Sequence, residues 1–516
     1  MTIIEHDQIK ADLTETADVV VIGSGCGGAT LAKEIARAGK RVVIVERGGY
    51  YTTQRGDFDQ RSDNMLARID GGRGIDTSIT GEIALMYGNC VGGASVHYWA
   101  DSWRLPADRN DIYVKAGLTG HDAATLAPIF DQIETDLNIH LDEPSDFNRM
   151  NQLFDLGAAK LGWKTERVPQ ARKNCQRSGH CYQGCAYDAK QSQLVTHVPA
   201  ALQAGARLYA DCRVDKITLD ARGHADGLVA SVIDRATGQA SGRTLRVKAK
   251  AVVLAAGGYS SAAIWLKSGL PNGSGQVGEN LFLNPCPYLY AAYDEPVVMW
   301  VNVPTATGVT DFRLARYGAD GRYIEGGYLL HPNQLQAEFV AATLPGFGPE
   351  HRALMDRLPN IGSAVSWIDD ENPGRIRLND AGLPTYDYVL RGVDMLKTRD
   401  ALKKQAQLLF ASGAREVISP DAAGARLRSP KDIGVFDTMD LSHGAMLLGG
   451  PHPAGALRMG ADPAHSVVSP THQAHEVPGL FVADPSVFPR PPSVDPSLTI
   501  MAFSVVASRN LLHWLG

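Results

Sequence analysis

The sequence lacks the features of a nucleic-acid-binding or membrane protein. Its 50 basic and 56 acidic residues give a formal net charge of −6, and the absence of a long basic run predicts no nucleic-acid partner. No stretch approaches roughly eighteen uninterrupted apolar residues, so we predict no membrane span. Residues 1–18 are polar and contain acids, unlike a secretory signal. The chain alone therefore predicts a cytoplasmic protein, and export to the periplasm would require a partner.

Cysteine is also scarce, and its count is odd. Seven cysteines exclude a fully paired disulfide framework. The composition, 44% hydrophobic and 21% charged, excludes a disordered or fibrous chain. A length of 516 residues fits about three structural units or one large enzyme body. Glycine, in contrast, is abundant with 53 residues, which indicates a backbone that approaches a ligand closely.

Residues 18–46 carry the clearest local pattern. A buried strand, a glycine-rich turn, a helix and a second buried strand follow one another. The turn has the dinucleotide-binding spacing of Gly23, Gly25 and Gly28, and the second strand ends at Glu46. Glu46 is placed to accept hydrogen bonds from ribose hydroxyls and would repel a ribose phosphate, which disfavours NADP. This unit does not separate FAD from NAD, and a tight turn in an unrelated α/β fold is the alternative.

A second segment of small residues, residues 87–97, holds paired glycines near a serine and a histidine. These residues are Gly92, Gly93, Ser95 and His97. Paired glycines suit close approach to another part of the same nucleotide or to a flat ring. A glycine turn in an ordinary loop is the alternative.

Three of the seven cysteines lie within eleven residues, at Cys175, Cys181 and Cys185. Three thiolates on a short loop suit an iron–sulfur site or a zinc site. Zinc would want a fourth ligand, and the neighbouring His180 is awkwardly placed to supply it. Free structural cysteines are the alternative.

Four separated stretches together resemble the glucose-methanol-choline (GMC) oxidoreductase family, which binds FAD. They are residues 23–46, residues 88–104, residues 252–258 with 277–280, and residues 452–460 with 484–499. The resemblance implies an α/β fold with a discontinuous Rossmann-like FAD-binding domain and an α+β substrate domain built on an antiparallel sheet. We expect the FAD-binding domain at 1–285, with a cover loop at about 50–100 and the cysteine loop at about 170–195. The substrate-binding domain is expected at 286–440, and residues 441–516 are expected to return to the FAD domain with the catalytic residues.

The resemblance also implies the cofactor contacts. Some members attach the flavin covalently at the position of His97, whereas others hold it noncovalently over a hydrogen-bonded histidine. The further contacts implied to the isoalloxazine, pyrophosphate, adenine and ribityl-phosphate regions are at Gly92, Gly93, Ser95, Val214, Asp484 and Pro496.

Two residues are the expected catalytic groups. His452 stands where the family places a histidine facing flavin N5, and a histidine suits the removal of a hydroxyl proton. A loop histidine is the alternative. Asp495 is a departure, because the family usually has His or Asn before this proline. An aspartate there is able to pair with protonated His452 or to act as a base, with a raised pKa if it is buried.

The three-cysteine spacing is similar to that of bacterial sugar and polyol dehydrogenases, in which it holds a [3Fe–4S] cluster. The likeness implies an FAD-dependent dehydrogenase that oxidises a CH–OH group of a sugar, glycoside, polyol or other alcohol. Electrons would pass through the cluster to an external acceptor, either a cytochrome or a small subunit. The alternatives are an O2-dependent oxidase that releases hydrogen peroxide and a non-redox FAD lyase of the same fold.

Overall fold

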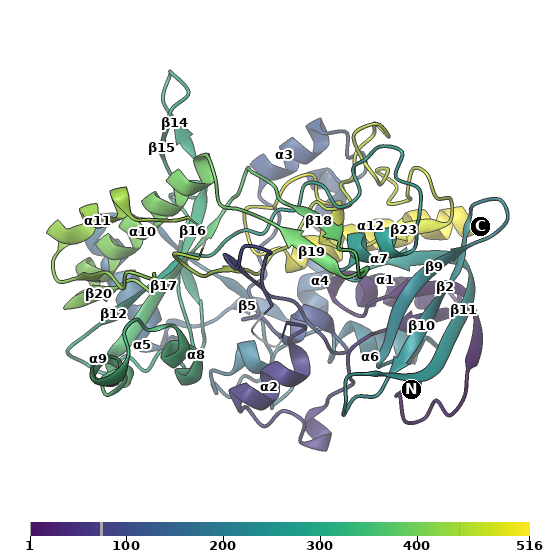
Figure 1. Ribbon diagram of the computed structural model, residues 1–516, viewed down its shortest axis with the longest axis horizontal. Helices are drawn as coiled ribbons and strands as arrows, with labels where there is room; N and C mark the ends of the chain where they lie inside the picture. The colour runs from purple at the N-terminus through teal and green to yellow at the C-terminus, as the bar shows by residue number, and fades with distance from the viewer. Residues whose placement is uncertain (1, 73–75, 443) are drawn as a thin grey trace.

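The computed structural model describes residues 2–72, 76–442 and 444–516, and two large sheets organise them (Figure 1). In the first sheet the neighbouring strands β1, β8, β3, β2 and β11 pair in parallel, and β23 also pairs with β11 in parallel. Strands β10 and β9 continue the sheet in antiparallel pairing. In spatial order its strands are β1 (Thr2–Ile4), β8 (Arg207–Tyr209), β3 (Val42–Val45), β2 (Leu13–Ile22), β11 (Ala240–Leu254), β10 (Ala225–Ile233) and β9 (Cys212–Leu219), with β23 (Leu480–Val482) beside β11.

The parallel centre of this sheet follows directly from its sequence. The ends of β2 and β3 are runs of Val and Ile that are buried throughout, as expected for strands covered on both faces. Helix α1 (Cys26–Arg37) begins immediately after the glycine turn and packs against α6 (His197–Gln203) and α12 (Ser497–Leu515). The predicted strand–turn–helix–strand unit is therefore confirmed.

The second sheet is antiparallel throughout. Its central strand, β17, is buried along its whole length, and helices α5 and α10 pack together beside it. Two of these elements, β6 and α5, precede residue 286 in the chain. In spatial order the strands are β21 (Arg426–Leu427), β20 (Glu416–Ile418), β12 (Tyr288–Ala292), β17 (Ile361–Ile368), β16 (Tyr328–Pro332), β13 (Thr307–Val309) and β6 (Thr165–Arg167).

These two sheets confirm the predicted fold class, a discontinuous Rossmann-like domain with a second domain on an antiparallel sheet, and the exact boundaries stay a prediction. The other strands form two-stranded pairs: β4 (Ile83–Leu85) with β22 (Leu448–Gly450), β5 (Ile139–Leu141) with β7 (Pro169–Ala171), β14 (Arg316–Tyr317) with β15 (Tyr323–Glu325), and β18 (Arg375–Leu378) with β19 (Pro384–Asp387). The other helices are α2 (Ser62–Ile69), α3 (Ala107–Lys115), α4 (Ala123–Asp136), α5 (Arg149–Leu161), α7 (Ser261–Lys267), α8 (Ala337–Thr343), α9 (Gly348–Met355), α10 (Val393–Ser412) and α11 (Val435–Thr438).

The segment expected as a cover loop contains a helix. The polar, glycine-rich stretch 57–80 contains the short amphipathic helix α2. Residues 73–75 of this stretch lie outside the described part. Met65 and Ile69, one helical turn apart, are both fully buried and pack with Phe58, Cys90 and Val96. Two buried apolar contacts outweigh the polar composition of the segment.

One described helix, α12, is long and apolar enough to cross a membrane by length and composition. In the structure 61% of its most apolar window is buried inside the protein. It contacts α1, α4 and β23, which is typical of a core helix of a folded domain.

Candidate active site

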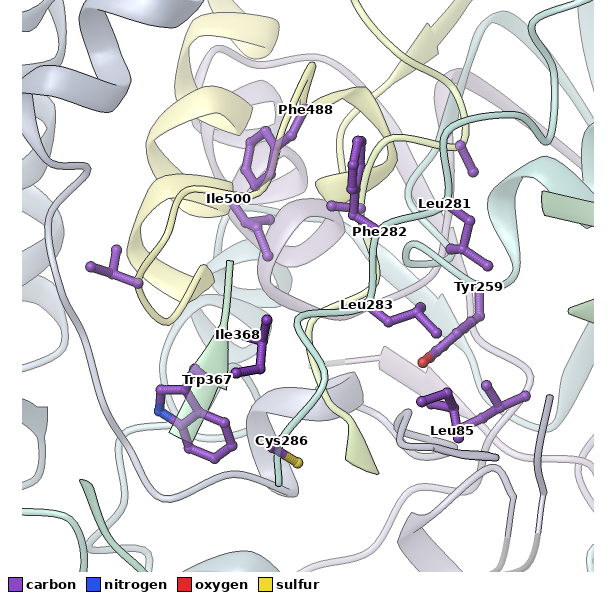
Figure 2. Close-up of a cluster of buried hydrophobic side chains, with 14 of the residues drawn as sticks. Leu85, Tyr259, Leu281, Phe282, Leu283, Cys286, Trp367, Ile368, Phe488 and Ile500 are labelled. Carbon is purple, nitrogen blue, oxygen red and sulfur yellow. The ribbon is translucent and has the colours of Figure 1, made fainter. Parts of the chain in front are cut away.

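A cavity of about 1060 Å³ connects the two sheet domains. At one end it is lined by the glycine turn before α1 and by residues 212–215 of β9. At the other end it is lined by β12, β17 and α8 of the second domain. Figure 2 labels three residues that line the cavity: Cys286, Trp367 from β17 and Ile500 from α12.

The glycine turn builds the narrow end of the cavity. A Cβ on Gly23 would lie 2.4 Å from the carbonyl oxygen of Ala255, and one on Gly93 would lie 2.8 Å from the Cα of Gly25. Both glycines also have positive φ, so larger residues would be strained as well as crowded. The first residues of α1 line this end, and the N-cap has no side-chain hydrogen bond, so the helix start is suited to bind a pyrophosphate.

Not every predicted glycine contact lines the cavity. Gly28 lies behind the turn, where a Cβ would be 2.1 Å from the carbonyl oxygen of Gly23, so it packs the helix on the strand. Gly92 also lies behind the lining, and its N–H donates to Ser24 Oγ at 3.0 Å. Ser95 lines the cavity, and its hydroxyl donates to the Gly92 carbonyl and accepts from Gln193 N–H.

Two predicted carboxylates, Glu46 and Asp484, line the cavity, but their oxygens accept hydrogen bonds from other groups of the protein. Glu46 accepts from the Ser24 N–H and hydroxyl and from the Gly48 N–H at 2.8–3.0 Å. Asp484 accepts from Gly257 N–H and from Ser261 and Ser486, and thereby joins the loop after β11 to the segment before α12. Burial raises the pKa of both carboxyls. The predicted ribose and ribityl-phosphate contacts stay predictions.

Three further predicted contacts, Val214, Pro496 and His97, also line the cavity. His97 Nδ1 donates to the carbonyl oxygen of Tyr182 at 2.6 Å, so the ring is the Nδ1–H tautomer. Burial lowers the pKa of His97, and within the described residues its Nε2 has no hydrogen-bond partner. This imidazole therefore keeps an unshared lone pair on Nε2.

His452 is held in one tautomer by a residue that the motifs did not single out. Its Nδ1 donates to Asn284 Oδ1 at 2.7 Å. The Asn284 amide nitrogen donates in turn to the Ile368 carbonyl, which fixes the amide so that its oxygen faces the imidazole. The lone pair of His452 is therefore on Nε2. Asn284 follows the 277–280 motif by only a few residues, but nothing in its spacing marks it.

The His452 lone pair faces Asp495. Nε2 lies 3.5 Å from Asp495 Oδ1, and the ring meets Trp367 edge-on at 5.6 Å between centroids. Burial, reinforced by nearby His331, lowers the pKa of His452 to about 3. Burial, reinforced by nearby Asp101, raises the pKa of Asp495 well above its ordinary range. Both predicted catalytic residues are thus brought together as a buried pair, and the neutral forms of both are favoured.

The three clustered cysteines line a separate, small pocket together with Arg172 and Lys190. Arg172 Nη1 lies 3.2 Å from Cys181 Sγ and 4.0 Å from Cys175 Sγ. Across residues 2–72, 76–442 and 444–516, no group of three His, Cys, Asp or Glu side chains is arranged to hold a metal ion. The predicted cluster therefore finds no support in this arrangement, and we derive no electron step through it.

The fold and the cavity first define a class, an α/β protein with a dinucleotide-binding turn at one end of a cavity and a buried histidine on its opposite wall. The family model described as GMC oxidoreductase matches the chain in two parts, residues 18–286 and residues 370–504. The chain belongs to the GMC oxidoreductase family, as its motifs predicted, and this membership supports FAD as its cofactor.

Relatives cover almost the whole chain. An uncharacterised GMC-type oxidoreductase of Mycobacterium tuberculosis is 30% identical over 99% of this chain and 80% of its own. A long-chain-alcohol oxidase of Arabidopsis thaliana is 23% identical over 98% of this chain and 69% of its own. Among solved structures, pyridoxine 4-oxidase from Mesorbium loti has a TM-score of 0.71 at 18% identity, over 96% of this chain and 99% of that chain. A formate oxidase has a TM-score of 0.72 at 14% identity, over 98% and 99%. These two likenesses show the shared fold.

Proposed function

We propose that the protein is an FAD-dependent enzyme that oxidises the CH–OH group of an alcohol to a carbonyl. One observation carries the proposal: His452, whose Nδ1 bond to Asn284 leaves the lone pair on Nε2, lines the same cavity as the dinucleotide-binding turn. When bound, FAD supplies the hydride acceptor of the reaction. The protein's own residues then have to remove the hydroxyl proton and hold the alcohol in place.

His452 is suited to the proton removal. Neutral Nε2 accepts the hydroxyl proton, and the imidazolium that results is stabilised by the hydrogen bond from Nδ1–H to Asn284. A low pKa keeps the imidazole unprotonated over the whole physiological pH range. Asp495, in its neutral form, is able to donate a hydrogen bond to the substrate oxygen beside the histidine.

The second-domain wall supports an alcohol with an apolar body. Aromatic and aliphatic side chains dominate this wall, and the nitrogens of its two buried amides donate within the protein. The amide nitrogen of Asn333 donates to Ser363, and that of Gln334 donates to the Val301 carbonyl. Within the described residues the amide oxygens of Asn333 and Gln334 and the indole N–H of Trp367 have no partner, so a small number of substrate polar groups would find partners among the apolar side chains. The apolar residues of the wall include Tyr288, Leu335, Phe339, Val365, Trp367 and Leu447.

Dioxygen is the electron acceptor that we propose. The Arabidopsis relative and the two solved structures carry the name oxidase. A dehydrogenase that passes electrons to a cytochrome or small subunit, as the cysteine spacing suggests, would turn over only with an added acceptor. Oxygen consumption with matching peroxide release, without any added dye, supports the oxidase. Turnover only with a dye contradicts it.

Anaerobic absorbance spectroscopy tests the activity itself. The purified protein should show bound flavin, and a short aliphatic or benzylic alcohol should bleach it in the absence of oxygen. Bleaching eliminates a non-redox lyase, because a lyase leaves the flavin oxidised. Protein loaded with FAD that no alcohol bleaches would overturn the proposal. A comparison of kcat/KM for benzyl alcohol and glucose then tests the substrate class, and preference for glucose would contradict the apolar body.

A further inference from the structure

A second buried carboxyl group, that of Asp101, interacts electrostatically with Asp495. Asp101 and Asp495 both line the cavity and are only 2% and 7% exposed. The Ser497 hydroxyl, two residues beyond Asp495, donates to the main-chain carbonyl of Asp101 at 3.1 Å and ties the two segments together. Two carboxylates this close in a buried site do not both ionise readily, so the pair has to share its charge unequally.

The hydrogen bonds decide which carboxyl group holds the charge. Asp101 Oδ1 accepts from the Gln170 amide at 2.7 Å, and the Thr305 hydroxyl lies 2.8 and 2.9 Å from its two oxygens. Arg172 holds Gln170 in place through a 2.9 Å bond to its amide oxygen. Asp495 Oδ2, in contrast, has no partner among the described residues. Side-chain donors stabilise the ionised form of Asp101, whereas within the described part of the chain the only hydrogen bond that lowers the pKa of Asp495 comes from its own main-chain N–H.

The surrounding charges agree with this division. Burial raises the pKa of Asp101 to about 7, and of the charged groups that face it Arg172 favours its ionised form whereas Asp142 opposes it. Tyr98 also lies near Asp101, and burial raises its pKa, so it is neutral. Around Asp495 the facing groups are His452 and Asp101 itself.

We propose that Asp101 is a positioning residue that carries the negative charge of the pair and thereby keeps Asp495 protonated. Protonated Asp495 presents one donor and one acceptor, as an asparagine does, next to His452 Nε2. This explains how an aspartate fills a position where the GMC resemblance implies His or Asn. The inference rests on the proposed alcohol oxidation for its kinetic consequences, but the protonation state itself does not depend on turnover.

The first test uses Asp495→Asn and Asp101→Asn in the FAD-loaded enzyme. Asp495→Asn keeps one donor and one acceptor at this position, so its kcat should exceed that of Asp495→Ala, and it should abolish the alkaline limb of the pH profile. Asp101→Asn removes the neighbouring charge, so the pKa of Asp495 falls and the alkaline limb moves to lower pH by roughly one to two units. The double variant should have the pH profile of Asp495→Asn alone. An inactive Asp495→Asn, or an unmoved limb in Asp101→Asn, would overturn the inference.

Infrared difference spectroscopy reads the proton without turnover. Wild type should keep the carbonyl stretch of a protonated carboxyl group at mildly alkaline pH. Asp495→Asn should lack this band, and Asp101→Asn should lose it at a lower pH than wild type. A wild-type band that survives Asp495→Asn would contradict the assignment. If no alcohol bleaches the flavin, the proposed function fails, yet this band still decides whether Asp495 is protonated.

Thr305→Val covers the case in which Asp101→Asn does not fold. It removes the hydroxyl that serves both Asp101 oxygens and should move the alkaline limb in the same direction by a smaller amount. Thr307→Val is the matched control, because Thr307 donates to Asp155, which is outside the cavity lining, at 2.6 Å. The control should keep the wild-type profile. Equal shifts in both variants would show a general effect of losing a hydroxyl and would contradict the role of Asp101.

Discussion

Asn284→Leu perturbs the base while leaving His452 itself in place. Leucine fills the site but offers no acceptor to His452 Nδ1–H and no donor to the Ile368 carbonyl. The lost bond matters most in the transition state, when the imidazole gains a positive charge. A hydrogen bond to a charged group is worth about 1.5–3 kcal/mol. At about 1.36 kcal/mol per factor of ten, kcat/KM should fall by roughly 10- to 150-fold.

The assay separates this catalytic effect from a loss of stability. Asn284→Leu also leaves the buried Ile368 carbonyl without its side-chain donor, which should cost about 1–3 kcal/mol of unfolding free energy. Asn110→Leu is the control, because the buried Asn110 amide donates to the His121 carbonyl away from the cavity. The control should lose comparable stability in urea unfolding and keep its kcat/KM. A fall in kcat/KM of less than about threefold for Asn284→Leu, or an equal fall for the control, would refute the reasoning.

Three other outcomes follow. His452→Ala should keep bound flavin, and its kcat should fall about 10²- to 10⁴-fold. Unchanged turnover would contradict the assignment of His452 as the base. Gly93→Ala should prevent FAD loading, measured by flavin absorbance, because its Cβ would crowd Gly25 and its φ is +57°. Burial depresses the folded-state pKa values of His331 and His452 to about 3, against about 6.5 when unfolded. Their contribution to stability is therefore present above about pH 6.5 and lost as pH falls toward 3. Urea unfolding at pH 7 and pH 5 should show a shallower decline in His331→Phe, and an identical decline would contradict this cause.

Elements that depend on local spacing and on runs of apolar residues could be predicted from the sequence. The turn before α1 and the buried strands β2 and β3 follow from spacing and from runs of Val and Ile, because local geometry alone determines them. The placement of His452 beside Asp495 also agrees with motifs that lie far apart in the chain.

Contacts made only by tertiary packing could not be predicted in this way. Helix α2 depends on the apolar surface that buries Met65 and Ile69, because the composition of its own segment predicts a loop. Asn284 donates to a main-chain carbonyl of β17, and Asp101 accepts from side chains of β7 and of the segment before β13. The three cysteines show that close spacing in the chain does not ensure a functional site, because among the described residues they do not form a metal-binding arrangement.

A crystal structure of the FAD-loaded enzyme tests the central claim most directly. We predict that the isoalloxazine lies on residues 93–97, facing His452 Nε2 closely enough for one alcohol to contact both, with the pyrophosphate at the start of α1. A ring placed at the far end of the cavity from His452, or nicotinamide in the place of the flavin, would contradict the account.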